Sequence, residues 1–208
     1  MPRQNRVDPF GGLVATECRG TLMGNRGCLH DEERRIRRAY ALRRWIFCVL
    51  EFRGRHRQIM APGRYTELFF LDEATALAAG HRPCAECQRE RYLQFRQAWL
   101  SANAGRVSGS FCSVDEIDDV LHGERLAPGR AKRTWRSPLA ELPAGAMIVG
   151  ERGVPFLVLA DRLLPWSACG YGPGIRRPAS GRAEVLTPPS TVGAIAAGFV
   201  PTVHASAR

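Results

Sequence analysis

The pair Cys84 and Cys87, separated by two residues and preceded directly by Pro83, is the feature that most constrains how this chain folds. A Cys-x-x-Cys turn can place both sulfur atoms on one ion, and Zn²⁺ in structural sites takes four such thiolate or imidazole ligands. A redox dithiol uses the same spacing, but it normally accompanies a βαβ pattern, which this segment lacks. The spacing therefore predicts a zinc knuckle at Cys84 and Cys87.

Two helices are expected to flank this knuckle. Asp72 is suited to cap the first helix, the residues 74–79 are mostly strong helix formers, and Gly80 ends it. The second helix is expected from about residue 88 to residue 102, because apolar side chains recur there at the spacing of one helix face: Tyr92, Phe95 and Trp99. The knuckle thus lies between two predicted helices.

The remaining elements predict an α+β fold. Residues 45–52, 56–60 and 65–70 are predicted strands of a short antiparallel sheet. A short acidic helix, capped by Ser113 or Asp115, is expected at residues 114–125, and short strands are expected at 147–149 and 156–159. Residues 165–190 are expected to be loop-rich, and a last small helix is expected at residues 190–197.

Two modules are expected from this order of elements. Residues 1–105 form a zinc-binding α+β module with the short sheet, the knuckle and two helices, and residues 106–208 form a smaller β-rich module with short helices. The small and polar residues 101–110 are the expected linker.

The third and fourth zinc ligands are left open between three residues. Cys48 lies on a predicted strand 36 positions before Cys84, while Cys28 and His30 share a loop flanked by glycine. Weaker candidates are Cys18, His81, Cys112 and Cys169. Seven cysteines in 208 residues are sparse and odd in number, which favours metal or thiol chemistry over structural disulfides.

The charge of the chain favours a polyanionic partner. Its formal net charge is +10, and between Arg34 and Arg57 nine arginines face the single acid Glu51. Such a concentrated positive field attracts nucleic acids. The arginines expected to contact nucleic acid are Arg26, Arg43, Arg44, Arg55, Arg57, Arg64 and Arg82.

The compartment is expected to be the cytoplasm of a bacterium. The sequence has no run of about 18 apolar residues that would span a membrane. Its first ten residues are polar and lack the apolar core of a secretion signal.

The stretch from Phe69 to Cys87, which contains Gly80-His81-Arg82-Pro83-Cys84-Ala85-Glu86-Cys87, resembles the second half of the Ada-type zinc-binding domain. That domain is the N-terminal methyl-acceptor module of the Ada DNA repair protein. The resemblance implies a four-cysteine zinc site, with Cys84 and Cys87 as the later pair, and contact with DNA phosphates. The family's earlier Cys-x-x-x-Cys pair is missing here, so no methyl-accepting nucleophile is assigned.

The sequence therefore predicts a protein that binds zinc, mainly for structure, and associates with nucleic acid, DNA being favoured, through an arginine-rich surface. The alternative is a nucleic-acid-processing enzyme, a repair protein or a nuclease, with the metal or His30 at its active site. A third reading is an interaction protein whose zinc only stabilises a small fold.

Overall fold

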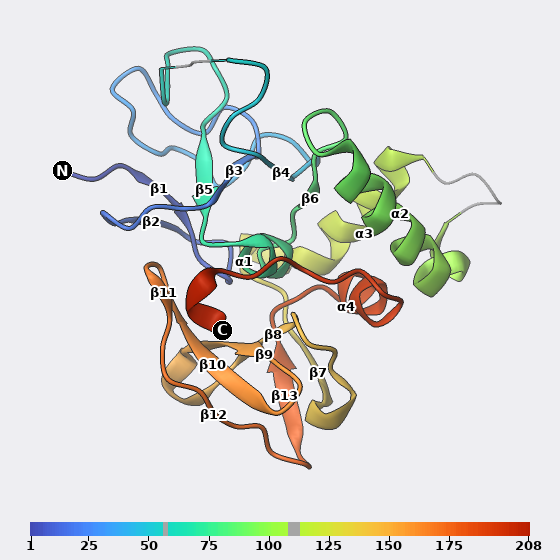
Figure 1. Ribbon diagram of the computed structural model, residues 1–208. Coiled ribbons are helices and arrows are strands. Elements are labelled where there is room, and N and C mark those ends of the chain that lie inside the picture. Colours follow the sequence, from blue (N-terminus) through green and yellow to red (C-terminus); the bar gives the residue numbers. More distant parts are fainter. Residues whose placement is uncertain (56–57, 108–112) are drawn as a thin grey trace.

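Helix α1 (Glu73–Ala78) lies between two β-sheets in the computed structural model, which describes residues 1–55, 58–107 and 113–208 (Figure 1). As expected, Asp72 caps the helix, and its side chain accepts a hydrogen bond from the Thr75 amide at 2.9 Å. Every residue of α1 is buried. Leu77 packs in a core with the first sheet, and Ala74 packs in a core with the second, which is why the small alanines recur on all sides of this helix.

The first sheet holds six strands in the order β2-β1-β5-β3-β4-β6. Its pairs are antiparallel except β1 with β5 and β4 with β6, which are parallel. The strands are β1 (Gln4–Val7), β2 (Leu13–Ala15), β3 (Leu22–Asn25), β4 (Ile46–Cys48), β5 (Leu68–Phe70) and β6 (Arg82–Pro83).

The second sheet is antiparallel and has the order β11-β10-β9-β8-β13-β7, with β12 paired to β10. Residues 165–190, which were expected to be loop-rich, contain the second half of β10 and all of β11, β12 and β13. The strands are β7 (Trp135–Pro138), β8 (Met147–Val149), β9 (Pro155–Val158), β10 (Arg162–Ser167), β11 (Gly170–Tyr171), β12 (Ile175–Arg176) and β13 (Arg182–Val185).

Three further helices pack beside the first sheet: α2 (Arg89–Asn103), α3 (Val114–Arg125) and α4 (Pro189–Ala196). Their apolar side chains enter the same core as Phe47 and Phe70 of the first sheet; these are Phe95, Trp99, Ile117, Leu121, Ala194 and Ile195. The first sheet thus lies before residue 105, the expected boundary between the modules, and the second sheet lies after it. Helices α3 and α4 also come after this boundary, but they pack in the core of the first sheet.

These elements confirm the α+β fold, with differences in detail. The strand expected over 45–52 is limited to β4, and residues 58–60 are not in a strand, since residues 59 and 60 form a turn. Residues 56 and 57 of that expected strand, and residues 108–110 of the expected linker, lie outside the described residues. The helix expected at 114–125 is α3, and Ser113 forms a capping box with Glu116.

Cys18 and Cys169 form a disulfide, with 5.0 Å between their Cα atoms. This corrects the expectation that the cysteines serve metal or thiol chemistry alone. Cys18 lies between β2 and β3 of the first sheet and Cys169 between β10 and β11 of the second. The bond therefore joins the two sheets directly.

None of the helices within the described residues combines the length and the apolar character that crossing a membrane requires.

Candidate metal centre

The sulfur atoms of Cys48, Cys84 and Cys87 lie within 4.8 Å of one another. Within the described part of the chain, these three form the sole group of three or more His, Cys, Asp or Glu side chains that could share an ion. Cys48 and Cys84 are each 8% exposed, and Cys87 is half-buried. The two knuckle cysteines are thus brought together with Cys48, one of the three further candidates that the sequence left open.

The pairing of β4 with β6 brings the sulfurs together. The two strands run parallel with Phe47 beside Pro83, so the next residues, Cys48 and Cys84, leave the pair side by side. The Cys84 amide donates to the Phe47 carbonyl at 2.9 Å, and Gln88 Nε2 donates to the same carbonyl at 2.9 Å. The start of α2 is thereby held against the end of β4, and Cys87 in the intervening turn faces the other two sulfurs.

The donor set fits zinc. Bonds of about 2.3 Å from Zn²⁺ to sulfur, in a tetrahedral arrangement, place sulfur atoms roughly 3.8 Å apart. The three sulfurs, all within 4.8 Å of each other, reach that spacing with a small contraction. Thiolates are soft ligands that select zinc over magnesium or calcium.

The cluster also favours the thiolate form of one of its cysteines, Cys84. Hydrogen bonds from Cys48 and then Cys87 hold the pKa of Cys84 far below its usual value, and the backbone amide of Glu86 contributes at 3.4 Å from the sulfur. The contact with Cys84, together with Cys87 and burial, raises the pKa of Cys48. One thiolate thus forms readily, and a divalent cation would offset the repulsion that opposes ionisation of the others.

A groove of about 780 Å³ opens beside the three sulfurs, and all three cysteines line it. We call it the thiolate groove. The segment that follows β4 forms one wall with Leu50 and Phe52, and β3 and β5 contribute Met23 and Phe69. Its volume lies in the range of small-molecule sites, which is about 300–1,000 Å³.

Strand alternation explains this placement. Phe47 and Phe70 point into the core, where each is fully buried, while their neighbours Cys48 and Phe69 line the groove on the opposite face. Met23 pairs with both Cys48 and Phe69 across the sheet. Met23 and Phe69 were not predicted from the sequence. The signal that could have found them is that they alternate with core-facing residues on β3 and β5, two strands of the sheet that also holds Cys48.

Two of the three carboxylates that line the groove have partners of their own. Glu86 accepts an ion pair from Arg55 Nη2 at 2.9 Å. Glu67, only 4% exposed, accepts a hydrogen bond from the Met60 amide at 2.7 Å. The third, Glu51, is exposed. None of them belongs to the group of side chains that could share the ion with the sulfurs.

Cys28 and His30, the other expected ligands, are not brought into this group. The Cys28 sulfur lies 3.7 Å from the His30 carbonyl. The His30 ring is buried, with Nδ1 at 2.6 Å from Thr66 Oγ1 and Nε2 at 3.2 Å from the Ala61 carbonyl. His30 therefore holds the loop that precedes β5.

Two of the arginines expected on a nucleic-acid surface are buried instead. Arg26 is 1% exposed and donates to His81 Nε2 at 3.1 Å and to the Gly11 carbonyl at 2.8 Å. Arg82 is 2% exposed and forms a two-pronged pair with Asp118, at 2.9 and 2.7 Å. Neither guanidinium can reach a phosphate without unfolding its surroundings.

The other expected arginines are at the surface where the structure describes them. Arg43 and Arg44 pair with Asp119 and Asp115 of α3, each at 3.1 Å. Arg55 lines the thiolate groove, and Arg64 is exposed next to the groove residue Tyr65. Arg57, and also the weaker ligand candidate Cys112, lie outside the described residues.

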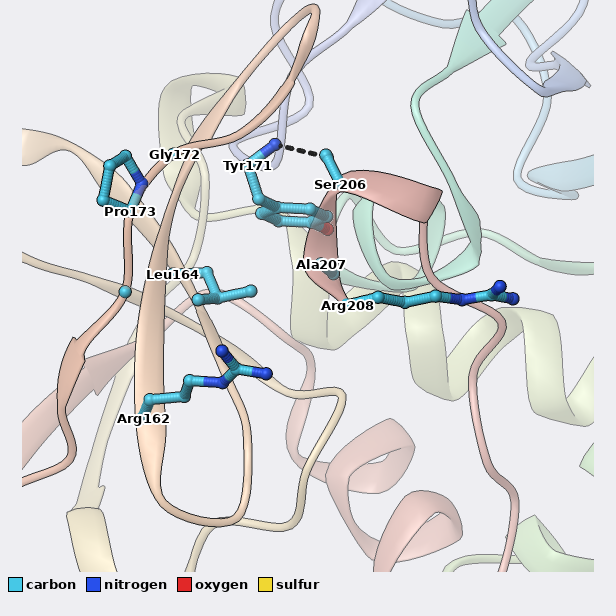
Figure 2. Close-up of a pocket in the computed structure, with 9 residues that line it drawn as sticks. Arg162, Leu164, Tyr171, Gly172, Pro173, Ser206, Ala207 and Arg208 are labelled. Carbon is cyan, nitrogen blue, oxygen red and sulfur yellow. Dashed lines mark hydrogen bonds between the residues drawn. The ribbon is translucent and has the colours of Figure 1, made fainter.

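A smaller pocket of about 260 Å³ lies between β10 and the C-terminal 3-10 helix (Ala205–Ala207) (Figure 2). The Tyr171 amide there donates to Ser206 Oγ at 2.8 Å. In the described structure, His, Cys, Asp and Glu are absent from its lining residues. It therefore offers no set of metal ligands, and the thiolate groove is the candidate functional site.

The resemblance of Phe69–Cys87 to Ada-type domains remains a prediction. No family model, curated protein or solved structure matches this chain.

Proposed function

We propose that this protein binds zinc through Cys48, Cys84 and Cys87 and associates with nucleic acid, DNA being favoured, on the face that holds the thiolate groove. The single observation that carries the proposal is the cluster of three sulfurs within 4.8 Å beside that groove. The net charge of +10 supports a polyanionic partner. Arg53 and Arg55 line the groove, and both guanidiniums lie over the Phe52 ring, at 5.0 and 5.3 Å.

The metal has a structural role in this proposal. It would join the end of β4 to the knuckle and so fix the first turn of α2 against the sheet. In zinc-finger peptides, structural zinc contributes about 10–16 kcal/mol of apparent binding free energy, which appears as folding free energy. Here the ion would stabilise the contact between the end of β4 and the start of α2. The groove wall after β4 would be positioned by the same ion.

A second candidate function is a nucleic-acid-processing enzyme with the metal at its active site. The observation that favours it is that the three sulfurs line a groove rather than a closed core. Catalytic zinc sites have three protein ligands and leave one position for water or substrate. His30 is engaged with Thr66 and Ala61, so the metal rather than His30 would supply the chemistry.

The test combines zinc content with salt-dependent binding. Purified protein is expected to carry about one zinc per chain, and its affinity for a labelled oligonucleotide, followed by fluorescence anisotropy, should fall steeply as salt rises. Arg53→Gln and Arg64→Gln should each weaken binding and reduce the salt slope by about 1. Arg136→Gln, an exposed position on β7 of the second sheet, is the matched control and should change neither.

Failure to bind any oligonucleotide at low salt, or affinity that does not depend on salt, would contradict the nucleic-acid part of the proposal. Zinc retained after Cys84→Ser would contradict the assignment of the metal.

A further inference from the structure

Among the described residues, the cluster supplies ligands for three of the four coordination positions of a zinc ion. Zinc takes four ligands, and the cluster supplies three sulfurs from the described residues. Glu86 and Glu67 in the groove are held by Arg55 and by the Met60 amide. The three cysteines themselves line the groove, so the direction opposite the sulfurs leads into it.

We propose that the fourth position of the metal opens into the thiolate groove and takes a neutral nitrogen donor from an unpaired nucleobase. The nucleobase as the ligand rests on the function proposed above. The open position itself rests on the three sulfurs, on the groove, and on the lack of a fourth donor beside them among residues 1–55, 58–107 and 113–208.

The charge of the centre selects a neutral donor. A Zn²⁺ ion with three thiolates has a net charge of −1, and a phosphate or carboxylate oxygen would add further negative charge in a half-buried site. Carboxylates already lie on the groove wall, among them Glu51 and Glu86. A ring nitrogen adds no charge and is a ligand that zinc accepts readily.

The side chains that line the groove favour a flat and mostly apolar ligand. Phe52, Tyr65 and Phe69 line it together with Met23 and Leu50. Bases stack on aromatic rings and on guanidinium planes, and the guanidiniums of Arg53 and Arg55 lie over Phe52.

A base that is paired and stacked inside a duplex cannot enter a concave groove, so it has to be unpaired or flipped out. Single-stranded nucleic acid is therefore the substrate class. Phosphates would remain outside, at the exposed arginines near the rim.

The open position is tested with imidazole, a neutral nitrogen donor, on the full chain loaded with Co²⁺ in place of zinc. The visible absorption of Co²⁺ reports its ligands directly. Imidazole is expected to shift the ligand-field bands with saturation, whereas acetate at the same concentration leaves them unchanged. Glu51→Gln is the control for an internal fourth ligand and should give the same spectra as the parent. Bands that do not respond to imidazole would overturn the open position.

The nucleobase is tested by adding a single-stranded oligonucleotide and a hairpin duplex that contains the same sequence. The single strand should shift the Co²⁺ bands and bind at least about tenfold more tightly than the duplex, as expected from one base–aromatic stack. Phe69→Leu should remove most of that preference, and Phe156→Leu on the second sheet should keep it.

The outcomes separate this inference from the proposed function. If both nucleic acids bind equally and the bands stay unchanged, the nucleobase ligand is overturned while nucleic-acid binding stands. If imidazole shifts the bands but neither nucleic acid binds, the open position is supported, and the nucleobase ligand fails together with the proposed function.

Discussion

Two buried guanidiniums lie against the indole of Trp45, with the Cζ atoms of Arg26 and Arg125 each 4.0 Å from the ring centroid. His81 completes this group: its Nε2 accepts from Arg26, and its ring lies 5.1 Å from that of Trp45. Burial, followed by the charges of Arg26 and Arg125, holds the pKa of His81 well below its usual value. His81 therefore stays neutral, because a proton would add a third positive charge to a dry cluster.

This neutrality makes stability depend on pH. Below pH about 6.5 the unfolded chain takes up a proton at His81 more readily than the folded chain, so the free energy of unfolding falls by up to about 2 kcal/mol from pH 7 to pH 5 through this group. His81→Phe should remove that share of the pH dependence. Urea unfolding of both proteins at the two pH values measures it, and an unchanged difference between them would contradict the assignment.

The metal ligands provide a second prediction at this scale. Cys48→Ser should lose most of the bound zinc, because only the two knuckle sulfurs then remain in the described cluster. Cys28→Ser should keep it, since the Cys28 sulfur contacts the His30 carbonyl instead. Competition with a chromogenic chelator measures both affinities. Equal losses in the two variants would show that the cluster is not the site.

Residues were predictable where their chemistry is local. Cys84 and Cys87 follow from one short motif, whereas Cys48 could not be chosen over Cys28 and His30, because the pairing of β4 with β6 that brings it to the knuckle is not a local signal. Arg26 and Arg82 were expected at the surface because charged side chains are rarely buried. Their burial depends on Trp45, His81 and Asp118, which are distant in the sequence, so no local pattern reveals it.

Among the elements, α3 reaches the approach to the metal centre through the side chain of Asp118. Asp118 is buried and holds Arg82, which precedes Pro83 and Cys84 by one and two positions. Burial raises the pKa of Asp118, although the hydrogen bonds and charge of Arg82 oppose this. The pair thus ties β6 and the start of the knuckle to a helix from the second half of the chain.

Neighbouring aspartates on α3 give a matched comparison. Asp118→Asn should destabilise the fold by about 3–5 kcal/mol, because it leaves the Arg82 charge buried and unpaired. Asp119→Asn should cost less than about 1 kcal/mol, since its pair with Arg43 is exposed. Denaturant unfolding measures both. Equal costs would mean that the Arg82 pair does not anchor the knuckle.

Helices were easier to predict than strands for a physical reason. The caps of α1 and α3, Asp72 and Ser113, are signals that lie within a few residues of the helix they start. By contrast, β11 to β13 are short, and they lie with the end of β10 among prolines and glycines that normally mark loops. They form because the second sheet supplies distant partners, which the local sequence does not describe.

For the molecule as a whole, the disulfide between Cys18 and Cys169 spans 151 positions and crosses from one sheet to the other. Sequence spacing could not predict it, because nothing local to either cysteine indicates its partner. Its Cα separation of 5.0 Å lies within the range that disulfides adopt. The chain therefore combines one oxidised pair with a cluster of thiols suited to a metal.

Loss of this bond should destabilise the fold by up to about 5 kcal/mol, because the loop that it closes is long and its removal raises the conformational entropy of the unfolded chain. Cys169→Ser tests this by urea unfolding, and a thiol reductant should have the same effect on the parent protein. The variant itself should not respond to the reductant. A parent protein that is equally stable with and without reductant would contradict the prediction.

The packing of Phe199 against Phe95, with ring centroids 5.3 Å apart, has a consequence for how the protein is made. A ribosome delivers the first sheet long before α4 and Phe199, which complete its core. Until α4 and Phe199 emerge, the nascent chain keeps apolar surface uncovered and is exposed to aggregation or to capture by chaperones. The core of the first sheet is therefore expected to close only after residues 189–199 have left the ribosome.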